Sequence, residues 1–161
     1  MADILIPTVA QGLMWALMAL GVYITFRVLD IADLSVEGSF PLGAAVAATA
    51  LVSGYGVTAA FLLAAVAGAL AGIVTGILTT KLKIPPLLAG ILTMIGLYSV
   101  NLHVMGKANV ALLRVDTVFS YAAGMGLTSD MAMMAVGLVG VMLVGVILYW
   151  FFGTELGTAI R

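Results

Sequence analysis

The sequence predicts an all-α protein, a polytopic transmembrane helical bundle with about five spans. Hydrophobic residues make up 64% of the 161 residues, charged residues make up 8%, and the mean hydropathy is +1.28. Soluble domains carry about 25% charged residues. Four long stretches are almost or wholly without charge, and Val57 to Thr80 has no charged residue at all. Because roughly 20 residues of helix cross a hydrocarbon core about 30 Å thick, each stretch is long enough to span a membrane.

The first two spans differ in length. The first is predicted over residues 4–26 and ends before Arg27. The second segment has an apolar run, residues 40–52, whose helical length of about 20 Å is too short to cross alone. It needs the preceding residues as well, including Glu37, so the second span is predicted over residues 34–52 and is short or broken.

The remaining spans are bounded by polar residues. The third is predicted over residues 57–80 and the fourth over residues 84–104, where a Pro-Pro pair opens the helix at no cost in hydrogen bonds. The stretch 105–130 is predicted to be an external loop that can hold a short interfacial or re-entrant helix. The fifth span is predicted over residues 131–152, and its end carries a Tyr-Trp pair typical of a membrane interface.

The basic residues predict the orientation. With five spans they divide four to two, and the positive-inside rule then places the N-terminus outside. A re-entrant second segment would give an even split, which favours five full spans. The basic residues predicted to be cytoplasmic are Arg27, Lys81, Lys83 and Arg161, and those predicted to be outside are Lys107 and Arg114.

Three glycines spaced four residues apart share one face of the third span. A face without side chains lets another helix approach backbone to backbone, so it predicts a tight packing interface within the subunit or between subunits. The alternative is that glycine is simply frequent in membrane helices. The three residues are Gly68, Gly72 and Gly76.

A polar stretch at the start of the second segment is the sharpest local motif. Acidic residues that enter hydrocarbon usually face protein, water or substrate, and a short segment interrupted by Gly and Pro is typical of transporter sites. The stretch therefore either lines a translocation pathway, or forms the helix break that shapes it, or is a cytoplasmic loop with a capped helix start. Its residues are Asp33, Ser35, Glu37, Gly38, Ser39 and Pro41.

Several classes of site are not expected. The net charge of −1 offers no basic patch for nucleic acid, and there is no cysteine. His103 is the only histidine, so no metal site is predicted, and no cofactor is expected. The chain has no P-loop, which means that it is not expected to be an enzyme and that nucleotide hydrolysis would need another subunit.

The region around the polar stretch resembles a known family. The run from Leu20 to Ala48, which includes Asp33 to Gly38, closely resembles the early region of bacterial ABC-transporter permeases of the branched-chain amino acid and ribose permease superfamily. It is most similar to a branch of uncharacterised permeases that pair with periplasmic binding proteins for aromatic amino acids and related solutes. Sugar members lack the glutamate found here at position 37.

The tail resembles the same family. Residues 152–161 are similar to the run that approaches the cytoplasmic coupling segment, which meets the ATPase, and the candidate residues there are Glu155, Gly157 and Arg161. Members are nearly twice this length. The resemblance therefore implies that residues 1–161 form a single transmembrane permease domain that stops before the coupling segment. Such a chain is expected to be incompetent for coupled transport by itself.

The resemblance implies the membrane subunit of an ABC importer in the bacterial inner membrane. It would move an amino acid or related solute by alternating access. Its partners would be membrane lipid, a second permease subunit in a homodimer, an ATP-binding cassette ATPase and a substrate-binding protein. The alternatives are a secondary transporter or channel, for which Glu37 is the only strong intramembrane ionisable candidate, and a membrane scaffold without transport.

Overall fold

A computed structural model describes residues 2–112, 115–124, 126, 128–155 and 157. Every regular element in these ranges is a helix. The elements are α1 (Ala2–Tyr23), the π-helical turn η1 (Ile24–Val28), α2 (Val36–Val52), α3 (Val57–Thr80), α4 (Pro86–Met105), α5 (Val118–Ala123) and α6 (Ser129–Phe152).

The helices confirm the predicted fold class. Four of them are long and apolar enough to cross a membrane, namely the α1–η1 stretch from Ile4 to Val28, α3, α4 and α6. The fifth apolar helix, α2, has 17 residues and is therefore about 25 Å long, which is short of the hydrocarbon thickness. The six-residue helix α5 lies inside the predicted loop of residues 105–130.

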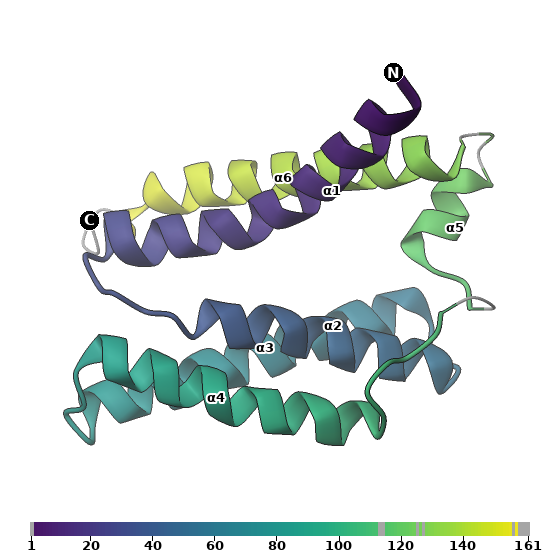
Figure 1. The fold of residues 1–161 in the computed structure, drawn as a ribbon. Helices are drawn as coiled ribbons and strands as arrows, with labels where there is room; N and C mark the ends of the chain where they lie inside the picture. Colours follow the sequence, from purple (N-terminus) through teal and green to yellow (C-terminus); the bar gives the residue numbers. More distant parts are fainter. Residues whose placement is uncertain (1, 113–114, 125, 127, 156, 158–161) are drawn as a thin grey trace. The chain divides into compact units, whose positions relative to one another are not determined.

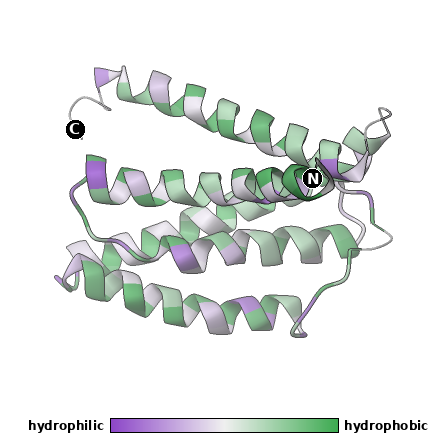
Figure 2. Cartoon of the chain, turned by 45° about the horizontal axis from the view of Figure 1, so that its top comes forward, coloured by the Kyte–Doolittle hydropathy of each residue, from purple (hydrophilic) through white to green (hydrophobic). Residues whose placement is uncertain are grey.

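Large apolar side chains are exposed along the long helices. Phe61 and Leu62 on α3 are 67% and 69% exposed, and Val146 on α6 is 67% exposed. Figure 2 shows this hydrophobic colouring along the helices of the chain. Such surfaces are stable in lipid, where an exposed leucine meets hydrocarbon instead of water.

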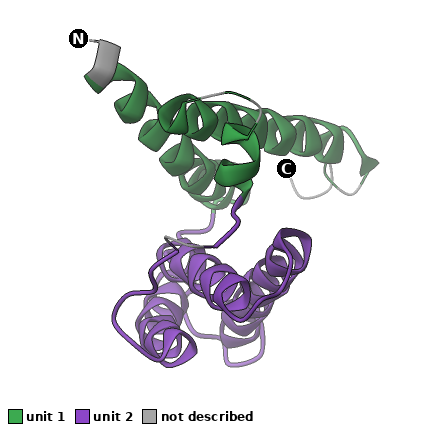
Figure 3. Cartoon of the chain, turned by 90° about the vertical axis from the view of Figure 1, so that its right-hand side faces the viewer, with its two compact units in different colours: residues 1–30, 118–161 green, residues 31–117 purple. Residues whose placement is uncertain are grey.

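The helices gather into two compact units, which Figure 3 colours separately. Unit 1 comprises residues 1–30 and 118–161, and in it α6 contacts both α1 and α5. A methyl group added at Gly137 of α6 would lie 3.0 Å from Leu13 Cβ, and one added at Gly140 would lie 3.7 Å from the Leu17 side chain. The residue numbers of the contacting pairs increase in the same direction along both helices. Helices α1 and α6 therefore run parallel (Figure 1).

Unit 2 comprises residues 31–117 and contains α2, α3 and α4, each in contact with the other two. The start of α2 lies against the start of α4, and near the other end the Thr49 hydroxyl donates to the Val104 carbonyl at 3.4 Å. Helices α2 and α4 are thus parallel. Helix α3, which connects them in the sequence, runs in the opposite direction (Figure 1). This alternation is what three successive membrane-crossing helices would show.

A buried polar pair joins α3 to α4. The hydroxyl oxygens of Thr75 and Thr93 are 3.0 Å apart, and both residues are buried. Thr75 Oγ1 also lies 3.2 Å from the Ala71 carbonyl of its own helix, so the hydroxyl stays satisfied without water. Interhelical hydrogen bonds of this kind contribute about 0.6 kcal/mol on average between membrane helices.

The three glycines of α3 do not form the contact face of unit 2. Nothing among the described residues lies within 4 Å of a methyl group added at Gly68, Gly72 or Gly76. The buried face of α3 instead includes Ala71 and Thr75, each one position before a glycine and therefore about 100° around the helix. Packing of the glycine face against another subunit stays a prediction.

Helix α2 is continuous where an interruption was expected. Gly38 and Pro41 both lie inside the helix, which runs unbroken from Val36 to Val52. The expected break is therefore not seen at these two residues, and the second apolar helix is short instead of broken. The non-helical segment comes earlier, at residues 30–34.

Candidate functional site

Asp33 holds the turn that leads into α2, which we call the capped turn. Its Oδ1 accepts a hydrogen bond from the Ser35 backbone N–H at 2.8 Å, and its Oδ2 accepts one from the Ser35 hydroxyl at 3.0 Å. Ser35 is the N-cap residue that precedes α2, so the Asp33 carboxylate closes a turn just before the helix, as Asp side chains commonly do. Of the two predicted capping candidates, Ser35 occupies the N-cap position without a side-chain bond to the helix, and Asp33 bonds to Ser35 itself.

This capped turn is seated on Gly90 of α4. A methyl group added at Gly90 would lie 2.6 Å from Asp33 Oδ1 and 2.7 Å from the Leu34 nitrogen, both too short for any real contact. Only glycine leaves room for the turn. Sequence reasoning missed Gly90, although a glycine inside an apolar helix is itself a signal because it costs helix stability relative to alanine.

Gly38 brings α2 close to α4 one turn further on. A methyl group there would lie 2.9 Å from Met94 Cα and 3.2 Å from Leu97 Cβ. The two helices therefore approach nearly backbone to backbone, which is the role that the sequence predicted for the glycines of α3. Gly38 packs α2 against α4 instead of breaking α2.

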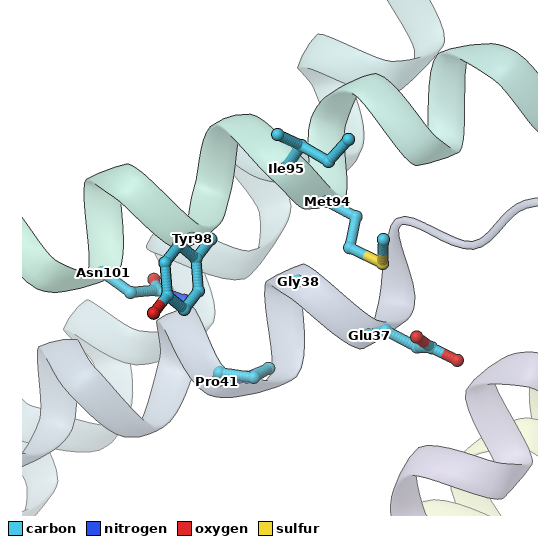
Figure 4. Close-up of a pocket in the computed structure, with 7 residues that line it drawn as sticks. All are labelled: Glu37, Gly38, Pro41, Met94, Ile95, Tyr98 and Asn101. Atoms are coloured by element: carbon cyan, nitrogen blue, oxygen red, sulfur yellow. The ribbon is translucent and has the colours of Figure 1, made fainter.

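At this contact the two helices line a partly open recess of about 360 Å³, which we call the α2–α4 recess. Figure 4 shows the Glu37 carboxylate at one end, pointing away from Tyr98 and Asn101 at the other end, with Pro41 between them. The recess lies wholly within unit 2. Its lining residues are Glu37, Gly38 and Pro41 of α2 and Met94, Ile95, Tyr98 and Asn101 of α4.

Asn101 is the unusual member of this lining. Its side chain is only 7% exposed, and within the part of the chain that the structure describes its Oδ1 has no hydrogen-bond partner. A buried polar atom without a partner costs about 1–3 kcal/mol, so such atoms are rare in native structures. Sequence reasoning assigned Asn101 no role, because burial of one residue cannot be inferred from an apolar helix pattern.

The predicted residues of the polar stretch thus separate into three groups. Asp33 and Ser35 form the capped turn, while Glu37, Gly38 and Pro41 line the recess. Ser39 donates from its hydroxyl to the Val36 carbonyl at 3.4 Å and is not part of the recess lining. Among the described residues, no group of three or more His, Asp or Glu side chains could hold a metal ion.

Two of the three C-terminal candidates, Glu155 and Gly157, are described and lie in unit 1. Gly157 donates its N–H to Thr154 Oγ1 at 3.3 Å, and Glu155 follows the end of α6. Arg161 lies outside the described residues. The two residues of the predicted aromatic belt are exposed at this end of α6, where Tyr149 is 86% exposed and Trp150 is also exposed. Such rings are typical of the headgroup level of a membrane.

Comparison with known proteins identifies the family. The family described as "Branched-chain amino acid transport system / permease component" matches residues 4–161. The chain belongs to this permease family. It is a multi-pass protein of the inner membrane, as its apolar helices also indicate.

Two curated relatives are similar to this permease chain. It is 45% identical over 116 residues to the tyrosine transport system permease protein of Clostridioides difficile (strain R20291), an alignment that covers 72% of this chain and 39% of that protein. It is 37% identical over 118 residues to an uncharacterized protein of Rickettsia prowazekii (strain Madrid E), covering 73% and 41%. The chain thus spans about two fifths of the length of the curated relatives it matches. No solved structure matches it significantly.

Proposed function

We propose that this permease chain forms part of the membrane subunit of an ABC importer that moves an amino acid or a related small solute by alternating access. The observation that carries the proposal is the family match over residues 4–161. The similarity to a tyrosine transport permease supports an amino acid as the solute. The apolar helices supply the membrane-embedded body that such a subunit requires.

The proposed assembly supplies what the chain lacks. None of the 161 residues forms a P-loop, so ATP would be bound and hydrolysed by an ATP-binding cassette partner. A second permease subunit, forming a homodimer, would complete the translocation route, and a substrate-binding protein would deliver the solute. Within this chain, we place the start of α2 on the route, because Glu37 is an exposed carboxylate beside the α2–α4 recess.

The parallel arrangement of helices supports five crossings, and the basic residues then favour an N-terminus outside. Because α1 and α6 run parallel in unit 1, the chain between them must cross an odd number of times if both helices span. Crossings by α2, α3 and α4 satisfy this condition, whereas a re-entrant α2 leaves an even number. The short α2 would cross where Leu34, Ser35 and the capped turn extend it toward the membrane surface.

Reconstitution tests the function. The complete permease is placed in proteoliposomes with the ATPase and binding protein encoded beside it, and uptake of radiolabelled amino acids is measured. We expect accumulation only with ATP, and none with an ATPase whose P-loop lysine is replaced. Uptake driven by an ion gradient without ATP would favour the secondary transporter, and assembly without any uptake would favour the scaffold.

A further inference from the structure

We infer that unit 1 carries a lipid site where α1–η1 and α6 end, and that this site binds the headgroup of a phospholipid with a primary ammonium. The ammonium lies among aromatic rings of the two helix ends, and the phosphate lies at Arg27. The site belongs to unit 1, whereas the α2–α4 recess belongs to unit 2, so the inference goes beyond the proposed function.

Unit 1 is hollowed between the last turns of α1–η1 and α6. The recess there holds about 590 Å³, within the range of roughly 300–1,000 Å³ that is usual for small-molecule sites. We call it the α1–α6 recess. Because α1 and α6 run parallel, it lies at the C-terminal ends of both helices. Four of its lining residues are aromatic, namely Tyr23 of α1 and Tyr149, Trp150 and Phe152 of α6.

The rings of this recess are accessible to a ligand. Besides Tyr149, Trp150 is 74% exposed and Tyr23 is 58% exposed. An ammonium group within about 6 Å of an aromatic face is attracted by the negative charge density of that face, and Trp attracts it most strongly. Several aromatic rings around one recess are therefore typical of sites that bind an ammonium group.

The two helix ends add to this preference for a cation. The last carbonyl groups of a helix have no partner within it, and the C-terminus carries a negative partial charge. Helix α6 has no basic residue in its last turn, and Glu155 follows its end. Asp30 follows η1 and is exposed. A primary ammonium also has N–H groups that can donate to free carbonyls, which a quaternary ammonium lacks.

Arg27 supplies a site for a phosphate at the rim of the recess. It is exposed in the last turn of η1, four residues after Tyr23 and directly before Val28, and both of these residues line the recess. Residues four apart in a helix are neighbours on its surface, and a guanidinium binds phosphate through paired N–H donors. A headgroup in which a phosphate is joined to an ammonium therefore fits the rim and the recess together.

The position along the helices favours a lipid over a dissolved cation. Both helices are long and apolar enough to cross a membrane, and Tyr and Trp at a helix end are typical of the headgroup level. Apolar side chains one turn before the rings, such as Val146 and Ile147, are exposed. Acyl chains can lie against these side chains while the headgroup occupies the recess.

Two lipids that share a phosphate and differ in the ammonium test the inference. The complete permease in detergent is titrated with dioleoyl phosphatidylethanolamine or dioleoyl phosphatidylglycerol, and bound lipid is measured by native mass spectrometry. We expect the ethanolamine lipid to bind at least fivefold more tightly. Trp150→Leu should weaken its binding at least fivefold and change binding of the glycerol lipid less than twofold. Arg27→Gln should weaken both, because both carry the phosphate.

Three further variants separate binding from folding. Trp150→Phe keeps a ring at the recess and should hold the ethanolamine lipid within threefold of the wild type. Tyr55→Leu removes a ring that is 59% exposed between α2 and α3 of unit 2, and should leave both affinities within twofold. Should Trp150→Leu fail to fold, Tyr149→Leu takes its place, with an expected loss for the ethanolamine lipid of at least threefold.

Four results would overturn the inference. Tighter binding of phosphatidylglycerol would show an anion site at Arg27, and a Trp150→Leu protein that loses both lipids equally would show that the ring does not recognise the ammonium. Equal effects of Trp150→Leu and Tyr55→Leu would show general anchoring by interfacial rings. Absence of saturable binding of either lipid would show that protein covers the recess. None of these results depends on ATP-dependent uptake, so the proposed function is tested separately.

Discussion

At the scale of single residues, two glycines of unit 2 allow close packing because they have no side chain. Gly90 receives the Asp33 turn, and Gly38 lets α2 approach Met94 on α4. Both glycines lie inside helices, where alanine would be intrinsically better by roughly 0.5–1 kcal/mol. Packing therefore outweighs helix propensity at these two positions.

Gly90→Ala should destabilise the protein. The added methyl group would lie 2.6 Å from Asp33 Oδ1, so the capped turn must shift, at a cost of about 1–3 kcal/mol. The measurement is the thermal unfolding midpoint of the purified protein. Gly96→Ala on the same helix is the control, because a methyl group there meets open space. A Gly90→Ala protein as stable as Gly96→Ala would contradict the close seating of the turn.

Substitutions at Asp33 and Glu37 should distinguish an effect on stability from an effect on transport. Asp33→Ala removes the acceptor for the Ser35 N–H and should lower stability by about 1 kcal/mol. Glu37→Gln leaves an exposed side chain of the same size and should lower uptake much more than stability in the complete permease. Uptake and unfolding are measured on both variants, and normal uptake by Glu37→Gln would remove this residue from the proposed route.

At the scale of helices, each element presents one face to its own unit and leaves another uncovered by the described residues of that unit. On α3 the inward face is lined by Ala60, Ala71 and Thr75 and contacts α2 and α4. The glycines at 68, 72 and 76 lie beside this face with no side chain against them. A surface of small residues on a membrane helix is favourable for contact with another helix.

Gly72→Leu should therefore act on assembly and not on unit 2 itself. Nothing in the described structure opposes a side chain there, whereas a helix packed on the glycine face would be forced away at a cost of about 1–3 kcal/mol. Size-exclusion chromatography and thermal stability of the purified complex measure the effect. Ile73→Leu is the control, because Ile73 is exposed and the substitution conserves the side-chain volume. An unchanged complex with Gly72→Leu would indicate that the face meets lipid.

At the scale of the whole molecule, the connection order and the helix directions carry the argument about topology. The parallel pair α1 and α6 in unit 1, and the parallel pair α2 and α4 in unit 2, each require an intervening reversal of the chain. Five alternating crossings meet both requirements at once. The positive-inside rule then decides which end is cytoplasmic.

Labelling of single cysteines should show this orientation. The 161 residues contain no cysteine, so Lys81→Cys and Lys107→Cys report on the two ends of unit 2 without interference from this part of the protein. With the N-terminus outside, an impermeant maleimide should label Lys107→Cys in intact cells and Lys81→Cys only after the membrane is opened. Labelling of Lys81→Cys in intact cells would reverse the proposed orientation.

The helices and their limits follow from the sequence alone. The predicted spans 57–80 and 131–152 match α3 and α6 within two residues, and the shortness of the second span was evident from its apolar run. This succeeds because the transfer of a helix into hydrocarbon depends on the composition and length of that helix, summed along the chain, and needs no knowledge of its neighbours.

Only the tertiary structure decided which small residues form close helix contacts and which polar residues are buried. The sequence placed close packing at Gly68, Gly72 and Gly76, whereas in unit 2 the close approaches fall at Gly38 and Gly90, and the buried amide is Asn101. Nearly every position in these helices is apolar or small, so the composition does not show which face of a helix meets another. Helix rotation and crossing point are set by contacts between residues far apart in the chain, and those contacts are what place Asp33 on Gly90 and leave Asn101 enclosed beside the recess.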